Sequence, residues 1–283
     1  MSNKVHVILD TDTYNECDDQ FALTYLIKHQ DIFDIDAITI APYSHHTIYI
    51  SAPDSQELSY NEAKKICKYF GFDEDKVYKG SMNYLQCGYS EDNDAVNKII
   101  EIANKNDKTC ILGIAAPTNI ALAIKKDPSI VDKIEIVWLG GNALDYENNT
   151  EYNFRQDLEA VRTMFNSGVA LTVLPAKGVV SKLNININVL KENIGNIDKM
   201  YDYLIERFHD DGYHPIREER PIWDISVIAY MVNKNWFEEK TISCPEIQDD
   251  MSYQFTKKRN EVTFITDLDK DKIYDDLFTR YKM

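Results

Sequence analysis

The sequence predicts an α/β fold in which helices cover both faces of an open, mostly parallel central sheet. Short apolar runs rich in β-branched residues alternate with segments of helical periodicity as far as Pro175, and this alternation is typical of such sheets. The 283 residues are 44% hydrophobic and 11% aromatic, which suffices for a packed core. No low-complexity segment or internal repeat divides the chain, so we expect one domain over residues 1–283.

The first predicted strand covers residues 5–9, an apolar run that is followed by polar residues. A helix follows, because apolar side chains from Phe21 to Ile27 recur near one helical stripe and Asp18 or Asp19 is placed to cap its start. Similar patterns predict strands at 35–40, 109–115, 134–139 and 169–174, and helices at 60–70, 94–104, 117–125 and 158–166.

The pattern changes after Pro175, where we expect a mainly helical C-terminal part from about residue 176. Residues 188–209, 223–232 and 269–281 have helical patterns. Two short β-rich runs, 253–255 and 262–265, resemble a hairpin that turns at 257–260.

Charge and cysteine content exclude several classes of protein. A net charge of −16 disfavours a nucleic-acid backbone or an anionic membrane as partner. The five cysteines are scattered and never form a CxxC pair, so neither a disulfide framework nor a zinc site is indicated. Since no signal segment or long apolar run is present, we expect a soluble protein of the cytoplasm.

Four aspartates lie within ten residues directly after the first strand: Asp10, Asp12, Asp18 and Asp19. In an open α/β sheet such a loop lies at the carboxyl edge of the strands, where ligands bind. Crowded carboxylates repel one another, and no Lys or Arg occurs between Lys4 and Lys28. A hard divalent cation with oxygen ligands is therefore the simplest counter-charge, and the alternative is a helix cap with solvated acids.

Four more polar clusters fall where strands or loops should end, at residues 115–119, 140–142, 150–157 and 222–224. Each has a purely structural explanation. Pro117 to Asn119 fits a helix start, Gly140-Gly141 a tight turn, and Asp157 and Asp224 fit helix N-caps. The order of the clusters along the chain is more specific than any one of them.

That order resembles the inosine-uridine-preferring nucleoside hydrolase family. The family has a DxDxxxDD segment, a PLTN-like turn, a GG segment, an EFN triplet followed by Asp, and a late HD pair. The similar residues here are Asp10-Thr11-Asp12 with Asp18-Asp19, Ala116-Pro117-Thr118-Asn119, Gly140-Gly141, Glu151-Tyr152-Asn153 with Asp157, and Trp223-Asp224.

The resemblance implies hydrolysis of the N-glycosidic bond of a ribonucleoside or related ribosyl compound, with Ca²⁺ as cofactor and a homodimer or homotetramer as the assembly. It implies that Asp12, Asp19, Asp224 and the main-chain carbonyl of Thr118 hold calcium, while Asp10 supports them from behind. It also implies that Asp18, Glu151, Asn153 and Asp224 contact ribose, with Asp12 as the general base. Asn142 is a further candidate contact to ribose or base. Calcium accepts six to eight oxygen ligands, and a carboxylate-rich pocket stabilises the positive charge that develops on the sugar.

The chain departs from the family pattern at two places. The first acidic segment is longer and contains the polar pair Asn15-Glu16. Glu16 is either a solvated loop charge or an additional polar contact. Trp223 replaces the late His and cannot deliver a proton to the departing base, so it either stacks on the base or packs in the core. Other candidate acids are His45, His46, His209, His214, Tyr43 and Tyr213.

Two other functions remain open from the sequence. A ribose- or nucleoside-binding protein without catalysis is compatible with the loss of the late His. The segment Asp10-Thr11-Asp12-Thr13 also fits the DxDxT start of a haloacid-dehalogenase-type phosphatase with Asp10 as nucleophile. That alternative leaves Asp18, Asp19 and Glu151 without a role.

Overall fold

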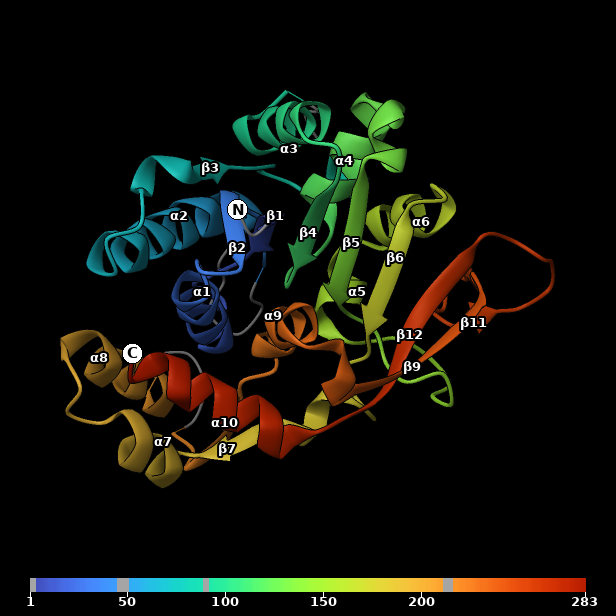
Figure 1. Ribbon diagram of the computed structural model, residues 1–283. Coiled ribbons are helices and arrows are strands. Elements are labelled where there is room, and N and C mark those ends of the chain that lie inside the picture. The colour runs from blue at the N-terminus through green and yellow to red at the C-terminus, as the bar shows by residue number, and fades with distance from the viewer. Residues whose placement is uncertain (1–3, 45–50, 89–91, 211–215) are drawn as a thin grey trace.

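The computed structural model describes residues 4–44, 51–88, 92–210 and 216–283. Within them, one sheet of eight strands has the order β3-β2-β1-β4-β5-β6-β12-β9 (Figure 1). Its centre is β1 (Val5–Thr11), which pairs in parallel with β2 (Phe33–Ile40) on one side and with β4 (Thr109–Gly113) on the other. The sheet continues in parallel through β5 (Ile134–Leu139) and β6 (Ala170–Leu174), and β3 (Val77–Lys79) forms one edge. The predicted α/β fold class is confirmed.

The other edge is antiparallel and differs from the predicted hairpin. β12 (Glu261–Leu268) runs parallel to β6 and pairs antiparallel with β9 (Phe237–Ser243). The run at 253–255 instead supplies β11 (Tyr253–Gln254), which pairs with β10 (Glu246–Ile247). The hairpin prediction was wrong because β9 is rich in charged residues, as exposed edge strands often are. Its sequence therefore does not resemble a strand, and its pairing with β12 was not predicted.

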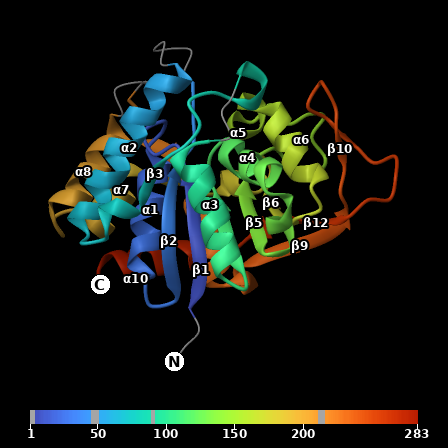
Figure 2. The same cartoon turned by 90° about the horizontal axis from the view of Figure 1, so that it is seen from above.

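Helices cover both faces of the sheet (Figures 1 and 2). On one face α1 (Asp18–Lys28), α2 (Ala52–Tyr69), α9 (Ile225–Val232) and α10 (Lys270–Tyr281) share a core with Val7 and Leu9 of β1. On the other, α3 (Asp94–Lys105), α4 (Thr118–Lys126) and α6 (Leu158–Asn166) pack with Ile8. Because neighbouring side chains of a strand point to opposite faces, both cores meet along β1.

The C-terminal part contains α7 (Ile187–Ile194) and α8 (Lys199–His209), with a short ladder of β7 (Asn184–Asn186) and β8 (Glu219–Pro221) beside them. The sequence pattern predicts a single helix over 188–209, and this prediction was wrong. Asn196 has a φ of 62° and its N–H donates to Asp202, so the chain turns between the two helices. Asn is one of the few residue types that adopts this conformation readily.

The carboxyl ends of the parallel strands lie at one edge of the sheet. The loops after β1 and β4 lead into α1 and α4 there, and the loop after β5 leads into α5 (Tyr152–Gln156), which the sequence patterns did not predict. Among the described residues, no helix has the length and apolar character needed to cross a membrane.

Candidate active site

A cavity of about 540 Å³ opens at this edge of the sheet. Its volume is in the range that small-molecule sites have in proteins. Aspartates line one part of it, and residues 150–153 with Arg155, Lys177 and Met251 line another. The acidic residues on its wall are Asp12, Glu16, Asp18, Asp19, Glu151 and Asp224.

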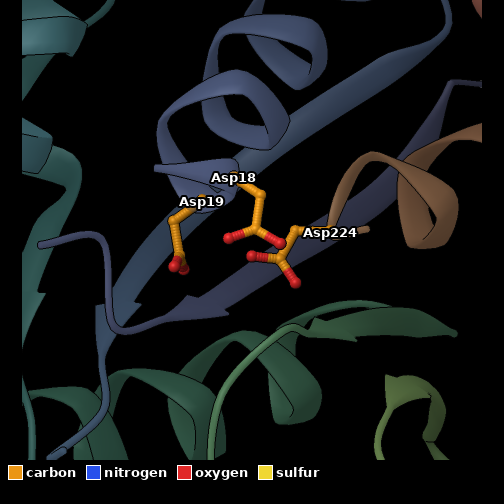
Figure 3. A group of neighbouring side chains, drawn as sticks. All are labelled: Asp18, Asp19 and Asp224. Atoms are coloured by element: carbon orange, nitrogen blue, oxygen red, sulfur yellow. The ribbon is translucent and has the colours of Figure 1, made fainter. Parts of the chain in front are cut away.

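Three aspartates from distant parts of the chain point toward one another in this cavity (Figure 3). One carboxylate oxygen each of Asp18, Asp19 and Asp224 lies within 4.8 Å of the others, and all three residues are buried. Asp18 and Asp19 form the first turn of α1, and Asp224 directly precedes α9. The sequence placed these residues together only through the family resemblance.

The simple helix-cap explanation fails for these aspartates. Cys17, not Asp18 or Asp19, occupies the N-cap position of α1, and no side chain caps that helix. Asp224 is at the N-cap of α9 but its carboxylate makes no capping hydrogen bond. By contrast, Asp157 does cap α6 by accepting from the Ala160 N–H, as the structural explanation predicts.

Successive side chains of β1 point to opposite faces of the sheet, which explains why Asp10 and Asp19 have different surroundings. Asp10 points toward α4, where its carboxylate accepts from Thr39 Oγ1 at 2.6 Å and Asn119 Nδ2 at 2.9 Å. Thr11 points toward α1 and donates to Asp19 Oδ1 at 2.5 Å. Asp10 therefore lies behind the cavity wall, while Thr11 orients one of the converging carboxylates.

Asp12 lines the cavity and is held by a residue of the longer loop. Asn15 Nδ2 donates to Asp12 Oδ2 at 3.0 Å, and the Asn15 N–H donates to the Asp12 carbonyl at 2.7 Å. Asn15 also lines the cavity. Glu16, the next residue of the longer loop, also lines the cavity.

Burial and mutual repulsion oppose ionisation of these acids. Burial raises the pKa of Asp12 well above its ordinary value, and the charges of Asp19 and Asp18 raise it further. Burial raises the pKa of Asp224 likewise, with added repulsion from Asp18 and Asp19. Burial raises the pKa of Asp19 to about 7, although the hydrogen bond from Thr11 opposes the shift.

Such a set of buried carboxylates suits a hard cation. One oxygen each of Asp18, Asp19 and Asp224 is close enough to share one ion, and none of the three forms an ion pair with a Lys or Arg among the described residues. A divalent ion would remove the repulsion that raises their pKa values. The residues present therefore fit a metal ion, and their oxygen-only chemistry favours calcium, magnesium or manganese over softer metals.

Glu151 and Asn153 form another part of the wall. The Glu151 carboxylate caps α5 by accepting from the Asn153 and Phe154 N–H groups, and it accepts from the Gly141 N–H at 2.9 Å. Gly141 has a φ of 72°, a turn conformation that favours glycine. Asn153 Nδ2 donates to the carbonyls of Ile114 and Leu139 at 3.2 and 3.1 Å, which leaves its Oδ1 for a ligand.

Two predicted site residues do not line the cavity. Thr118 is the first residue of α4 and its hydroxyl donates to Asp157 Oδ2 at 2.7 Å. Asn142 is buried, and its Nδ2 donates to the Asn148 carbonyl at 2.9 Å. Ile114, four residues before Thr118 and directly after β4, does line the cavity.

Trp223 lines the cavity, and two hydrogen bonds hold it in place. Its N–H donates to Asp18 Oδ2 at 3.1 Å and its indole Nε1 donates to Asn184 Oδ1 at 3.2 Å. The ring is partly buried against the core, so stacking and packing both contribute to its place. Tyr43 is buried and His209 is exposed, and neither lines the cavity. His45, His46, Tyr213 and His214 lie outside the described residues.

Some cavity residues have no counterpart in the sequence-based prediction. Tyr152, Arg155, Lys177 and Met251 line the wall beside Glu151. Tyr152 and Arg155 belong to the segment 150–157 that the sequence singles out, whereas Lys177 and Met251 follow no pattern that marks a site. Only the fold brings them to the cavity.

Comparisons with known proteins agree with this architecture. The family model described as "Inosine-uridine preferring nucleoside hydrolase" matches residues 7–275. A "Probable ribonucleoside hydrolase" of Dictyostelium discoideum is 25% identical over 208 residues, which are 64% of this chain and 59% of that protein. A "Pyrimidine-specific ribonucleoside hydrolase RihB" of Escherichia coli is 36% identical over 89 residues, 30% of this chain and 28% of that protein. These matches thus span less than two thirds of each relative.

A solved structure is similar over nearly the whole chain. The "Purine-Preferring Ribonucleoside Hydrolase from Gardnerella vaginalis" superposes with a TM-score of 0.80 at 21% identity and covers 98% of both chains. This likeness supports the fold, and the family model covers the strand-end acids as well as Asp224. The chain therefore belongs to the inosine-uridine preferring nucleoside hydrolase family.

Proposed function

We propose that this protein hydrolyses the N-glycosidic bond of a ribonucleoside or related ribosyl compound, releasing ribose and base, with calcium as its cofactor. The observation that carries the proposal is the convergence of Asp18, Asp19 and Asp224 in a buried cavity. Membership of the nucleoside hydrolase family supports the reaction type.

We assign calcium to Asp12, Asp19 and Asp224. We assign the main-chain oxygen ligand to Ile114 in place of Thr118, because Ile114 lines the cavity and Thr118 does not. When bound, the ion makes nearby water more acidic and neutralises the carboxylates. Asp10 supports this set from behind through its bonds to Thr39 and Asn119.

The chain's own residues supply the rest of the reaction. Asp12, oriented by Asn15, accepts a proton from the attacking water as general base. Asp18, Glu151 and Asn153 bind ribose hydroxyls, and Asp224 contributes a further contact to the sugar. As the bond to the base breaks, positive charge grows on the ribose ring, and the surrounding carboxylates stabilise it.

The side chain at the base is Trp223, which stacks and does not donate a proton. Asn142 is a weaker candidate for a direct substrate contact, since its Nδ2 is engaged by Asn148. Asp10 does not line the cavity, which argues against the phosphatase alternative that needs Asp10 as nucleophile. By analogy with the family we also propose a homodimer or homotetramer in the cytoplasm, which size-exclusion chromatography and fractionation test.

The test is release of free ribose from a panel of purine and pyrimidine nucleosides by calcium-loaded protein. We expect release that stops with a calcium chelator, resumes on calcium addition, and falls by at least about a hundredfold in Asp12→Asn. Asp107→Asn is the matched control, because Asp107 is exposed on the surface. Tight nucleoside binding without ribose release would establish the non-catalytic alternative instead.

A further inference from the structure

Two basic residues, Arg155 and Lys177, line the same cavity as the acidic residues. Both residues are exposed. In the described part of the chain, neither forms an ion pair with a carboxylate. In a protein with a net charge of −16, two cations without acidic partners at one cavity call for an explanation.

Both cations belong to segments that form hydrogen bonds at the part of the cavity wall where Glu151 lies. Arg155 lies in the last turn of α5, and its N–H donates to the Glu151 carbonyl at 3.0 Å. Its guanidinium lies over the Tyr152 ring, 5.0 Å from the ring centroid. Such stacking holds an Arg side chain in place while its N–H groups stay available.

The segment that contains Lys177 is connected to Glu151 by two hydrogen bonds through the backbone of Gly141. The N–H of its neighbour Ala176 donates to the Gly141 carbonyl at 2.9 Å. Gly141 in turn donates its N–H to Glu151 Oε2 at 2.9 Å. Backbone contacts therefore connect the segments of both cations to Glu151, and all three residues line the same cavity.

The charge of Arg155 opposes the rise that burial causes in the pKa of Glu151, but Glu151 forms no ion pair with either cation in the described part of the chain. Its two carboxylate oxygens accept three backbone N–H groups, from Gly141, Asn153 and Phe154. A neutral nucleoside would leave both cations facing solvent. A guanidinium fork and an ammonium group together match a phosphate or carboxylate much better than a neutral hydroxyl.

We propose that Arg155 and Lys177 bind an anionic group on the sugar side of the substrate, so that the preferred substrate is a phosphorylated ribosyl compound such as a nucleoside 5′-monophosphate. The inference rests on the proposed function, because Glu151 is the residue assigned there to the ribose hydroxyls. The anion belongs on the sugar and not on the base, since both cations line the cavity with that residue and their segments contact its backbone or side-chain partners.

The experiment compares kcat/KM for inosine and uridine with that for their 5′-monophosphates, using calcium-loaded protein at low ionic strength. We expect the monophosphates to be favoured by at least about tenfold. The preference should vanish in the Arg155→Ala/Lys177→Ala double variant, shrink with added salt, and persist in Lys105→Ala, whose exposed side chain lies on α3.

Several results would overturn the inference while leaving the hydrolase intact. Equal or better hydrolysis of the neutral nucleosides is one, and a preference that survives in the double variant is another. A preference for orotidine over uridine without any preference for monophosphates would place the anion on the base and refute the sugar-side assignment.

If no ribosyl compound is hydrolysed, the proposed function fails and a binding measurement decides the inference separately. Calorimetry then compares ribose 5-phosphate with ribose. Tighter binding of ribose 5-phosphate that disappears in the double variant supports the role of Arg155 and Lys177. Equal binding of the two sugars refutes it.

Discussion

Asn15 Nδ2 donates to Asp12 Oδ2 at 3.0 Å, and both side chains are buried at the cavity. Asn15 belongs to the residues that lengthen the first acidic loop, so the longer loop contributes directly to the orientation of the proposed base. A general base works only when its carboxylate is held in the right geometry.

Replacing Asn15 should therefore impair turnover more than binding. In Asn15→Ala we expect kcat to fall about tenfold, with KM changed by less than about twofold. Steady-state kinetics on the best nucleoside measures both. Asn61→Ala, an exposed position on α2, is the control. A kcat equal to that of the parent would show that Asn15 does not position Asp12.

Removing one of the converging carboxylates should raise the thermal stability of the metal-free protein and lower the stability that calcium adds. Asp224→Asn relieves the repulsion from Asp18 and Asp19 that raises the pKa of Asp224 beyond the effect of burial. The metal-free variant should melt at a higher temperature than the metal-free parent. Calcium at about a hundred times its Kd should stabilise the parent by about 2.7 kcal/mol and the variant by much less.

Differential scanning calorimetry with and without calcium tests these two opposite changes in stability. The control variant Asp107→Asn should melt like the parent in both states. A parent protein that calcium does not stabilise would contradict the metal site. A metal-free Asp224→Asn that is less stable than the parent would contradict the repulsion.

Trp223 predicts an unusual dependence on the leaving group. Because an indole cannot protonate the base, turnover should rise steeply as the leaving group becomes less basic. We expect p-nitrophenyl ribofuranoside to be hydrolysed at least about a hundredfold faster than uridine. In Trp223→His this ratio should shrink, since imidazole can donate a proton near neutral pH. An unchanged ratio, with folding verified by circular dichroism, would argue that the leaving group is protonated from elsewhere.

Asp276 predicts how stability depends on pH away from the cavity. Burial alone would raise the pKa of Asp276, but hydrogen bonds from His29 and Tyr25 outweigh it and hold the pKa below the ordinary value of 3.8. The Tyr25 hydroxyl donates to Asp276 Oδ2 at 2.5 Å, and His29 Nε2 lies 3.1 Å from the same oxygen. These contacts fasten α1 to α10.

A carboxylate with a lowered pKa stabilises the fold above its unfolded pKa, and the contribution is lost as the pH falls through the folded pKa. Asp276→Asn should lower the free energy of unfolding at neutral pH by about 1–3 kcal/mol. The gap between variant and parent should close below about pH 4. Urea titrations at several pH values measure the gap, and a gap of constant size would contradict the ionic origin.

The sequence predicts the strand-and-helix alternation well because buried parallel strands are continuous apolar runs, as in β1. It also brings Asp18, Asp19 and Asp224 to attention through their motifs. It misses β9, whose Glu238, Glu239 and Lys240 are surface residues of an edge, and α5, which is too short for a periodic pattern. Contacts that span the fold, such as Asn119 to Asp10 over 109 residues, have no local signal.

Thr118 illustrates a different limit. Its place in the PLTN-like turn suggests a carbonyl at the site, yet α4 begins at this residue and its hydroxyl is directed to Asp157. A motif identifies the loop, and the exact residue that reaches the cavity depends on where the strand ends. Ile114 occupies that place.

The hydrogen bond from the Trp223 N–H to Asp18 joins residues that are 205 positions apart. During translation, the acidic first loop therefore leaves the ribosome long before the segment that contains Trp223 and Asp224. Nascent chains carry this negative charge uncompensated until their last quarter emerges, because domains acquire their structure as units while they are being made. The set of converging carboxylates at this edge of the sheet is therefore complete only once most of the chain has been made.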